Sequence, residues 1–115
     1  IGRGTKFADL ISIGHGTSIG PHCLLVSLVG VAGSVTMGHH VVLGGQTGVA
    51  GHLTIGDGVQ AIAQTGIATD IPAGIQVGGA PAIPADTAKR NAMASTNLAA
   101  LFKRVKKLER AAKQD

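Results

Sequence analysis

The sequence predicts an all-β chain, a parallel β-helix built from hexapeptide repeats, followed by one C-terminal helix. An apolar residue recurs every six positions from Ile1 to Ala73. A second small or β-branched residue follows each of these after four positions, from Thr5 to Val77. Near the C-terminus the apolar period changes to that of a helix. A six-residue period sustained over this length fits neither an α-helix nor an alternating strand, and it is typical of hexapeptide solenoids.

The repeat predicts which residues face the core of residues 1–78. Three hexads make one triangular coil of 18 residues, and successive coils stack by parallel pairing at about 4.8 Å. Glycine often follows the first inward residue, as in Gly2, Gly14 and Gly20, and we expect it to supply backbone freedom at the corners. The first inward set is Ile1, Phe7, Ile13, Ile19, Leu25, Val31, Met37, Leu43, Val49, Ile55, Ala61, Ile67 and Ala73.

The end of the chain is predicted to change structure twice. Pro72, Pro81 and Pro84 lie in Gly-rich sequence, so residues 79–94 are predicted to form an exit loop. Residues 95–113 are predicted to form an amphipathic basic helix, capped by Ser95, Thr96 or Asn97. A lone helix of this length is marginal in water. Its stripe therefore needs the solenoid wall or further copies of itself, and it consists of Leu98, Leu101, Phe102, Val105, Leu108 and Ala112.

Composition bounds the class of protein further. Only 2% of the residues are aromatic, so the core must be built from Ile, Val, Leu and Ala. The single cysteine, Cys23, occupies an inward position and is interpreted as a small buried apolar residue, not as a nucleophile or half of a disulfide. Because the sequence has no apolar run of about 18 residues and no signal-peptide pattern, we expect a soluble, cytoplasmic protein.

The five histidines are the first candidates for chemistry. His22 and His40 fall at the same position of successive coils and, like His39, at turns, so we interpret all three as solvated turn residues. His15 and His52 differ by two coils plus one residue, which places them at one corner about 10 Å apart. These two histidines could line one groove.

A column of small residues continues from His15 along that corner. Gly33 and Gly51 lie one and two coils beyond it at the same coil position. A histidine followed by two glycines leaves a slot lined by backbone N–H groups, which suits an extended ligand with a carbonyl to polarise. The pattern alone leaves a catalytic histidine and a polar corner residue both open.

Several segments together resemble one enzyme family. These are residues 13–15, 49–57, 70–74 and 79–84, which read IGH, VAGHLTIGD, DIPAG and GAPAIP. With the basic C-terminal helix, they resemble UDP-3-O-(3-hydroxyacyl)glucosamine N-acyltransferase, which adds the second acyl chain in lipid A synthesis. The resemblance covers nearly the whole chain and implies a left-handed β-helix, a homotrimer and active sites in grooves between subunits.

The resemblance also implies roles for single residues. His15 matches the general base that takes a proton from the glucosamine 2-amino group as it attacks the acyl thioester. Gly33 matches the residue whose N–H stabilises the oxyanion, His52 a second active-site histidine, and Gly51 a residue along the pantetheine arm. The acyl donor would be acyl carrier protein with its 4'-phosphopantetheine, and the acceptor a UDP-glucosamine lipid precursor. Neither a metal, a tightly bound cofactor nor a covalent acyl-enzyme is implied.

The chain departs from the family at several points. An Asp-Asn pair commonly precedes the catalytic histidine, and its Asp orients the imidazole; here Ala8 and Asp9 stand there. Either Asp9 reaches the His15 ring from the neighbouring position, or the base lacks this partner. The family's N-terminal uridine-binding domain is missing, so we expect a part of a longer protein that alone binds nucleotide sugar poorly. Gly66 and Ala68 replace residues that limit acyl length in some members.

Charge is concentrated in the tail. Residues 1–84 carry two basic and three acidic side chains, whereas residues 85–115 carry eight basic and three acidic ones. Such a helix is usually a solvated face, but the resemblance favours a docking patch for the acidic carrier protein. Without interleaved aromatic residues it does not indicate nucleic acid. The patch consists of Lys103, Arg104, Lys106, Lys107 and Arg110.

Two other functions use the same solenoid. A zinc hydratase of the carbonic-anhydrase type needs three histidines on one metal. Beyond His15 and His52 the sequence offers no well-placed third, because Asp57 stands where one would be sought. A non-catalytic scaffold would need none of the column formed by His15, Gly33 and Gly51.

Overall fold

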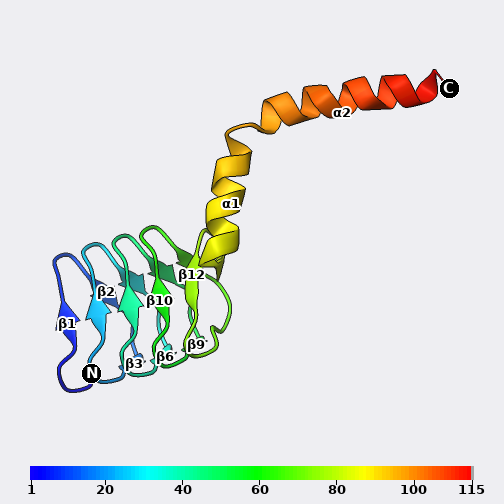
Figure 1. Ribbon diagram of the computed structural model, residues 1–115. Helices are drawn as coiled ribbons and strands as arrows, with labels where there is room; N and C mark the ends of the chain where they lie inside the picture. The colour runs from blue at the N-terminus through cyan, green and yellow to red at the C-terminus, as the bar shows by residue number, and fades with distance from the viewer. Residues whose placement is uncertain (115) are drawn as a thin grey trace.

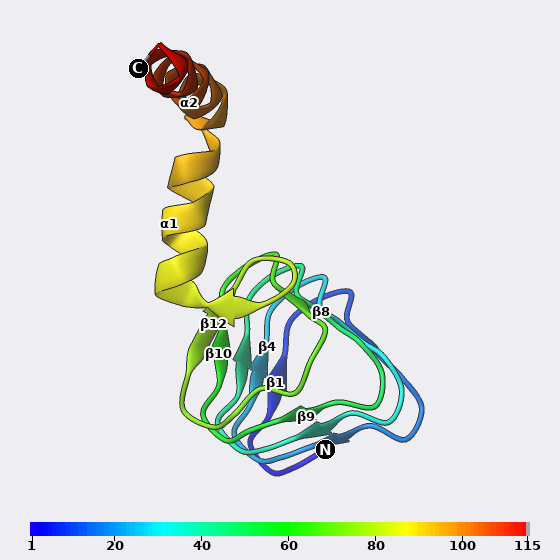
Figure 2. The ribbon, with the colours of Figure 1, turned by 90° about the vertical axis from the view of Figure 1, so that its right-hand side faces the viewer.

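The computed structural model describes residues 1–114 as a β-helix followed by two helices. Its coils stack side by side, and the helices lead away from the last coil (Figure 1). Viewed along the stack, the coils superimpose as a triangle (Figure 2). With the stacked coils and the projecting helices together, the molecule measures 67 × 25 × 21 Å. The predicted fold class, a left-handed parallel β-helix with a C-terminal helix, is confirmed.

Three sheets form the sides of the triangle, and we call them A, B and C. Sheet A contains β1 (Lys6–Phe7), β4 (Leu24–Leu25), β7 (Val42–Leu43), β10 (Gln60–Ala61), β12 (Gln76–Gly78) and β13 (Ile83–Pro84). Sheet B contains β2 (Ser12–Ile13), β5 (Gly30–Val31), β8 (Gly48–Val49) and β11 (Gly66–Ile67). Sheet C contains β3 (Ser18–Ile19), β6 (Thr36–Met37) and β9 (Thr54–Ile55). We name the turns between them the AB, BC and CA corners.

The register advances by three hexads per coil, except in the last coil. Phe7 pairs with Leu25, whereas Ala61 pairs with Val77, so the last coil is two residues shorter than the first. The shortening lies after β11, because Ile71 bridges Ile55 at the same reduced separation. Ile71 therefore occupies the inward position predicted for Ala73, which is exposed. The prediction for Ala73 is wrong because this coil omits two residues at its corner.

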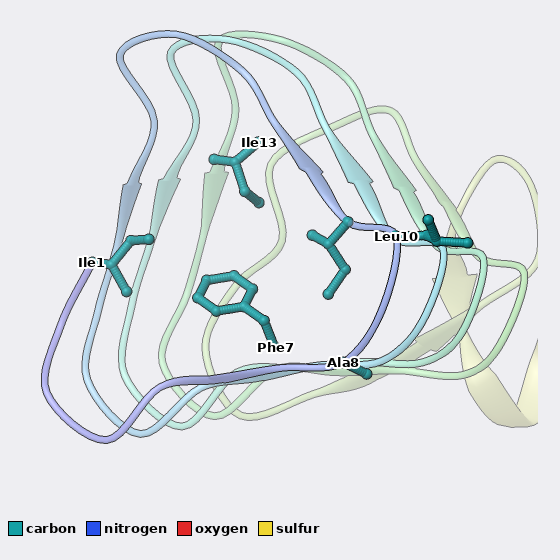
Figure 3. Close-up of a pocket in the computed structure, with 6 residues that line it drawn as sticks. Ile1, Phe7, Ala8, Leu10 and Ile13 are labelled. Carbon is teal, nitrogen blue, oxygen red and sulfur yellow. The ribbon is translucent and has the colours of Figure 1, made fainter.

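The core is a continuous column of aliphatic side chains from the inward positions. Its centre is fully buried at Leu25, Val35 and Leu43. The first coil is covered on one side only, so its inward side chains line a shallow hollow at the end of the stack (Figure 3). Phe7 points into the triangle there and remains 39% exposed. Stacking of coils, rather than any single coil, buries the core.

The corners use glycine differently from the prediction. Left-handed backbone occurs at the fourth residue of a hexad, counted from the inward residue, and non-glycine residues such as Leu10, His52 and Gln64 adopt it there. The glycine directly after the inward residue has ordinary φ. A Cβ on Gly44 would lie 2.7 Å from the amide nitrogen of Ala63 in the next coil. That glycine is required for close stacking, not for backbone freedom.

The exit segment differs from the predicted loop over 79–94. β13 pairs antiparallel with β12, and helix α1 (Ala85–Ser95) follows directly. Pro84 stands at the N-cap of α1, where its fixed φ suits the start of a helix. The alanine-rich sequence after it has high helix propensity. Prolines therefore end the solenoid, but the last one begins a helix and does not extend a loop.

Helix α2 (Leu98–Lys113) has no buried residue. Asn97 is its N-cap residue, without a capping hydrogen bond from the side chain. Both ribbon views show α2 leading away from the solenoid (Figures 1 and 2). Of the two partners predicted for its apolar stripe, the solenoid wall is therefore excluded in this structure. No helix within residues 1–114 is long and apolar enough to cross a membrane.

Candidate functional site

The candidate site is the BC corner, which consists of residues 14–17, 32–35 and 50–53. Strands β2, β5 and β8 pair in register on one side of it. His15, Gly33 and Gly51 each stand two residues after an inward residue. The structure therefore stacks them one above another, in the predicted column.

Backbone hydrogen bonds hold the turns of this corner together. The amide of Ser34 donates to the His15 carbonyl at 2.9 Å, and the amide of His52 donates to the Gly33 carbonyl at 3.1 Å. The hydroxyl of Thr17 donates to the Ala32 carbonyl at 2.7 Å and accepts from the next coil. The corner is a fixed frame, because each turn is bonded to the one beside it.

Gly33 leaves its backbone N–H uncovered, as do other third residues of the hexads such as Ser27, Gly45 and Gly51. Its amide N–H has no hydrogen-bond acceptor among residues 1–114, although the amides of Ala32 and Ser34 on either side both donate. A Cβ at position 33 would lie 2.9 Å from the His15 carbonyl oxygen. Glycine is therefore needed for the coils to stack here, and its N–H remains available to an acceptor from outside the chain.

The two histidines of this corner present their rings to solvent. His15 and His52 are both exposed, and neither ring hydrogen-bonds to a residue within 1–114. His15 is the third residue of its hexad, whereas His52 is the fourth and has left-handed backbone with φ 62°. The rings therefore leave the corner from different turn positions, two coils apart.

Asp9 lies at a different corner from His15. It is the third residue of its hexad at the AB corner, where its amide donates to the Ser27 hydroxyl at 3.4 Å. Strand β2 spans the side of the triangle between Asp9 and His15. Within residues 1–114 no hydrogen bond joins the two side chains. A single chain thus does not provide the contact between Asp9 and the His15 ring that the sequence left open.

The other three histidines gather at the CA corner. His22, His39 and His40 are exposed at turns, as predicted, but they interact with one another and with Asp57. Sequence reasoning placed His22 and His40 at the same position of successive coils but missed the contacts of His39 with His40 and Asp57. The signal was present, because His39 and Asp57 are one full coil apart in the sequence, as are His22 and His40.

The structure also bears on three other features considered in the sequence: the cysteine, a possible metal site and the basic residues of the tail. Cys23 is buried, with 2% of its surface exposed, and is a free thiol. Within residues 1–114 no three His, Cys, Asp or Glu side chains converge as a metal site, which is what a hydratase would require. The basic residues Lys103 to Arg110 lie on α2, remote from the BC corner (Figure 1).

Two curated proteins match this chain closely in sequence. UDP-3-O-acylglucosamine N-acyltransferase 3 of Gloeobacter violaceus is 58% identical over 110 residues, covering 96% of this chain and 32% of that protein. UDP-3-O-acylglucosamine N-acyltransferase of Nitratidesulfovibrio vulgaris is 56% identical with the same shares. The chain spans about one third of the length of these relatives. No protein-family model matches the chain.

Solved structures share its solenoid. LpxA from Acinetobacter baumannii superimposes with a TM-score of 0.69 and 30% identity, covering 70% of this chain and 31% of that one. Neisseria gonorrhoeae serine acetyltransferase has a TM-score of 0.69 and 25% identity, covering 72% and 36%. Over nearly its whole length the chain is therefore similar to a part of the UDP-3-O-acylglucosamine N-acyltransferases.

Proposed function

We propose that this chain is the catalytic β-helix of an N-acyltransferase. The enzyme would move a 3-hydroxyacyl chain from acyl carrier protein to the 2-amino group of UDP-3-O-acylglucosamine, a step of lipid A biosynthesis. The names of its relatives support the reaction class. The observation that carries the proposal is the Gly33 N–H, which has no acceptor within residues 1–114 and lies in one column with His15.

His15 is the proposed general base. As the amine nitrogen attacks the thioester carbonyl, the C–N bond forms and the C–S bond breaks. The nitrogen gives a proton to the imidazole, which returns one to the leaving pantetheine thiol. Imidazole suits both transfers near neutral pH. Exposure of the His15 ring supports the proposal, because the acceptor amine must reach it.

The backbone of the same column would stabilise the reacting carbonyl. In the tetrahedral intermediate the carbonyl oxygen becomes an oxyanion, and the N–H of Gly33 would donate to it. One such donor is typically worth about 2.7–4 kcal/mol. Gly51 would lie beside the pantetheine arm, and His52 would be the second active-site histidine. The 4'-phosphopantetheine arrives on the donor, so the proposal needs neither a resident cofactor nor an acyl-enzyme.

A homotrimer is the proposed assembly, with each site in a groove between two chains. Two observations support it. Asp9 and His15 lie at different corners of one coil, so a carboxylate from Asp9 could orient the imidazole only across a subunit boundary. Helix α2 also exposes its apolar stripe, with 61% of Phe102 and 69% of Leu108 accessible, and further copies of the helix could cover it.

The basic face of α2 is the proposed docking site for acyl carrier protein. The solenoid carries nearly balanced charge, and the cations gather on the projecting helix. Charge complementarity would steer the acidic carrier to the helix and raise the rate of encounter. Acyl carrier protein as donor would also place the reaction in the cytoplasm.

His15→Gln in the protein of natural length tests the catalytic assignment. We expect kcat/KM for N-acylation to fall by about 10²- to 10⁴-fold, with the far-UV circular dichroism unchanged. Arg3→Gln is the matched control, because Arg3 is the third residue of a hexad in the same coil at another corner. A His15→Gln enzyme as fast as the control would show that His15 is not the base.

The docking proposal is tested separately by charge reversal on α2. We expect Arg104→Glu with Lys107→Glu to raise KM for acyl carrier protein at least tenfold at low salt and to leave kcat nearly unchanged. The effect should shrink as salt screens the charges. Lys113→Glu, nearer the end of the helix, is the control. Equal KM values in both variants would place carrier docking elsewhere.

A further inference from the structure

The CA corner holds a side-chain cluster that the proposed reaction does not use. It consists of His22, His39, His40 and Asp57, drawn from three successive coils. The Asp57 carboxylate accepts the His39 amide at 2.9 Å and contacts His39 Nε2 at 3.3 Å. His39 Nδ1 in turn lies 3.0 Å from His40 Nδ1. These contacts form a connected series from Asp57 through His39 to His40.

This series of contacts assigns the tautomers of the two imidazoles of His39 and His40. A carboxylate only accepts hydrogen bonds, so the neutral form of His39 carries its proton on Nε2 and has a lone pair on Nδ1. His40 must then donate from Nδ1, which leaves the lone pair on its Nε2. A histidine whose other N–H is held by an acceptor is the usual arrangement of a metal ligand.

His22 is placed beside His40 by the repeat. Both residues have left-handed backbone, with φ 58° and 54°, at the same turn position of successive coils. Their rings therefore leave the backbone in the same direction, with centroids 5.1 Å apart and planes tilted by 35°. Two imidazoles bound to one zinc ion at about 2.1 Å each have ring centres about 5 Å apart. The separation of the two rings matches that geometry.

The fold also leaves room around the two rings. A Cβ on Gly4, in the coil before His22, would collide with the His22 ring, so this glycine makes space for it. A Cβ on Gly58, in the coil after His40, would meet nothing within 4 Å. Both histidines are exposed, so water can complete a coordination shell.

We infer that His22 and His40 bind one divalent transition-metal ion of the zinc class, bridging two coils, with His39 and Asp57 as positioning residues. Imidazole nitrogen is a ligand that Zn²⁺, Ni²⁺ and Cu²⁺ accept. The chain supplies two ligands and water the others, unlike the three histidines of a catalytic zinc site. The proposed metal site lies at a different corner from His15. The inference therefore does not depend on the acyltransferase proposal.

Isothermal titration of the whole chain with zinc chloride tests the inference. We expect one ion per chain, and an affinity at least tenfold lower in His22→Asn and in His40→Asn. Asparagine is chosen because it tolerates left-handed backbone. Asp57→Asn should weaken binding by about 10- to 100-fold without removing a ligand. Zinc should also raise the melting temperature of the wild type but not of the double variant His22→Asn/His40→Asn.

His52→Asn is the matched control, because His52 has the same turn position and a left-handed φ of 62° at the BC corner. Its zinc affinity should equal that of the wild type. If zinc binding were lost in His52→Asn and kept in the double variant, the ion would belong to the BC corner and the inference would be wrong. Absence of binding by the wild type at millimolar zinc would also overturn it, leaving the rings as a stacked structural pair.

Discussion

The BC and CA corners are built from the same turn and differ in what fills it. Both recur once per coil, and both place left-handed backbone at the fourth residue of a hexad, as at His52 and His40. At the BC corner the third residue is glycine in two coils, and the N–H of Gly33 has no acceptor within residues 1–114. At the CA corner His39 and Asp57 take that position and pair with each other.

The difference shows where this fold allows chemistry to vary. Inward positions are restricted by the core, and a glycine after them, such as Gly44, is restricted by close contact with the next coil. The third and fourth residues face solvent, so most of them can vary, although Gly33 is held to glycine by the His15 carbonyl of the neighbouring coil. One corner can therefore present unpaired groups to a substrate, while another satisfies its polar side chains internally.

Among the predictions that compare the two corners, the largest expected effect is the loss of activity in Gly33→Ala at the BC corner. In Gly33→Ala the new Cβ would lie 2.9 Å from the His15 carbonyl, so the turn and its free N–H must shift. We expect kcat for N-acylation to fall by about 10²- to 10³-fold. Gly45→Ala is the control, because this third residue at the AB corner would make an ordinary contact of 3.5 Å. Equal rates in the two variants would contradict an oxyanion role for Gly33.

The next effect concerns stability at the CA corner. In Gly38→Ala the new Cβ would overlap the Asp57 carboxylate and lie 2.9 Å from its amide nitrogen. We expect the free energy of unfolding to drop by about 1–3 kcal/mol. Circular dichroism is the suitable probe, since the chain has no Trp or Tyr. Gly48→Ala meets nothing within 4 Å and should lose no stability; an equal loss in both would disprove the steric explanation.

The smallest expected effect is a change in the free energy of unfolding, and it separates the cost of left-handed backbone from the contribution of side-chain contacts. His52→Gly should raise the free energy of unfolding by about 1 kcal/mol, because glycine removes the cost of left-handed backbone. His40→Gly removes the same cost but also the contacts with His22 and His39, so its gain should be smaller. Thermal unfolding of both variants measures the difference. A larger gain at position 40 would mean that the histidine cluster does not stabilise the corner.

Much of the solenoid could be predicted, because each coil repeats one pattern. The inward positions from Ile19 to Ile67 are buried as the six-residue period requires. Counting by whole coils also placed His15, Gly33 and Gly51 in one column. The prediction failed in the last coil, where a corner loses two residues and Ile71 replaces Ala73 inside. A period carries no information about where it is interrupted.

Two further features depended on contacts that a pattern does not show. Helix α1 begins at Ala85, although Pro72, Pro81 and Pro84 indicated a loop, because a proline at an N-cap is compatible with the helix that follows. Asp9 lies six residues from His15 in sequence but one side of the triangle away in space. Nearness along the chain therefore overstated how close the two side chains are.

By itself the sequence determined the β-helix, its core and the column formed by His15, Gly33 and Gly51. The reason is that each stacked coil needs the same kinds of side chain at the same positions, so the pattern recurs at a constant interval. Only the tertiary structure decided which polar groups are left free. Whether the Gly33 N–H finds an acceptor, and whether His39 meets Asp57, depends on how neighbouring turns approach one another. That approach is set by contacts between coils, and residues brought together by stacking are far apart in the chain.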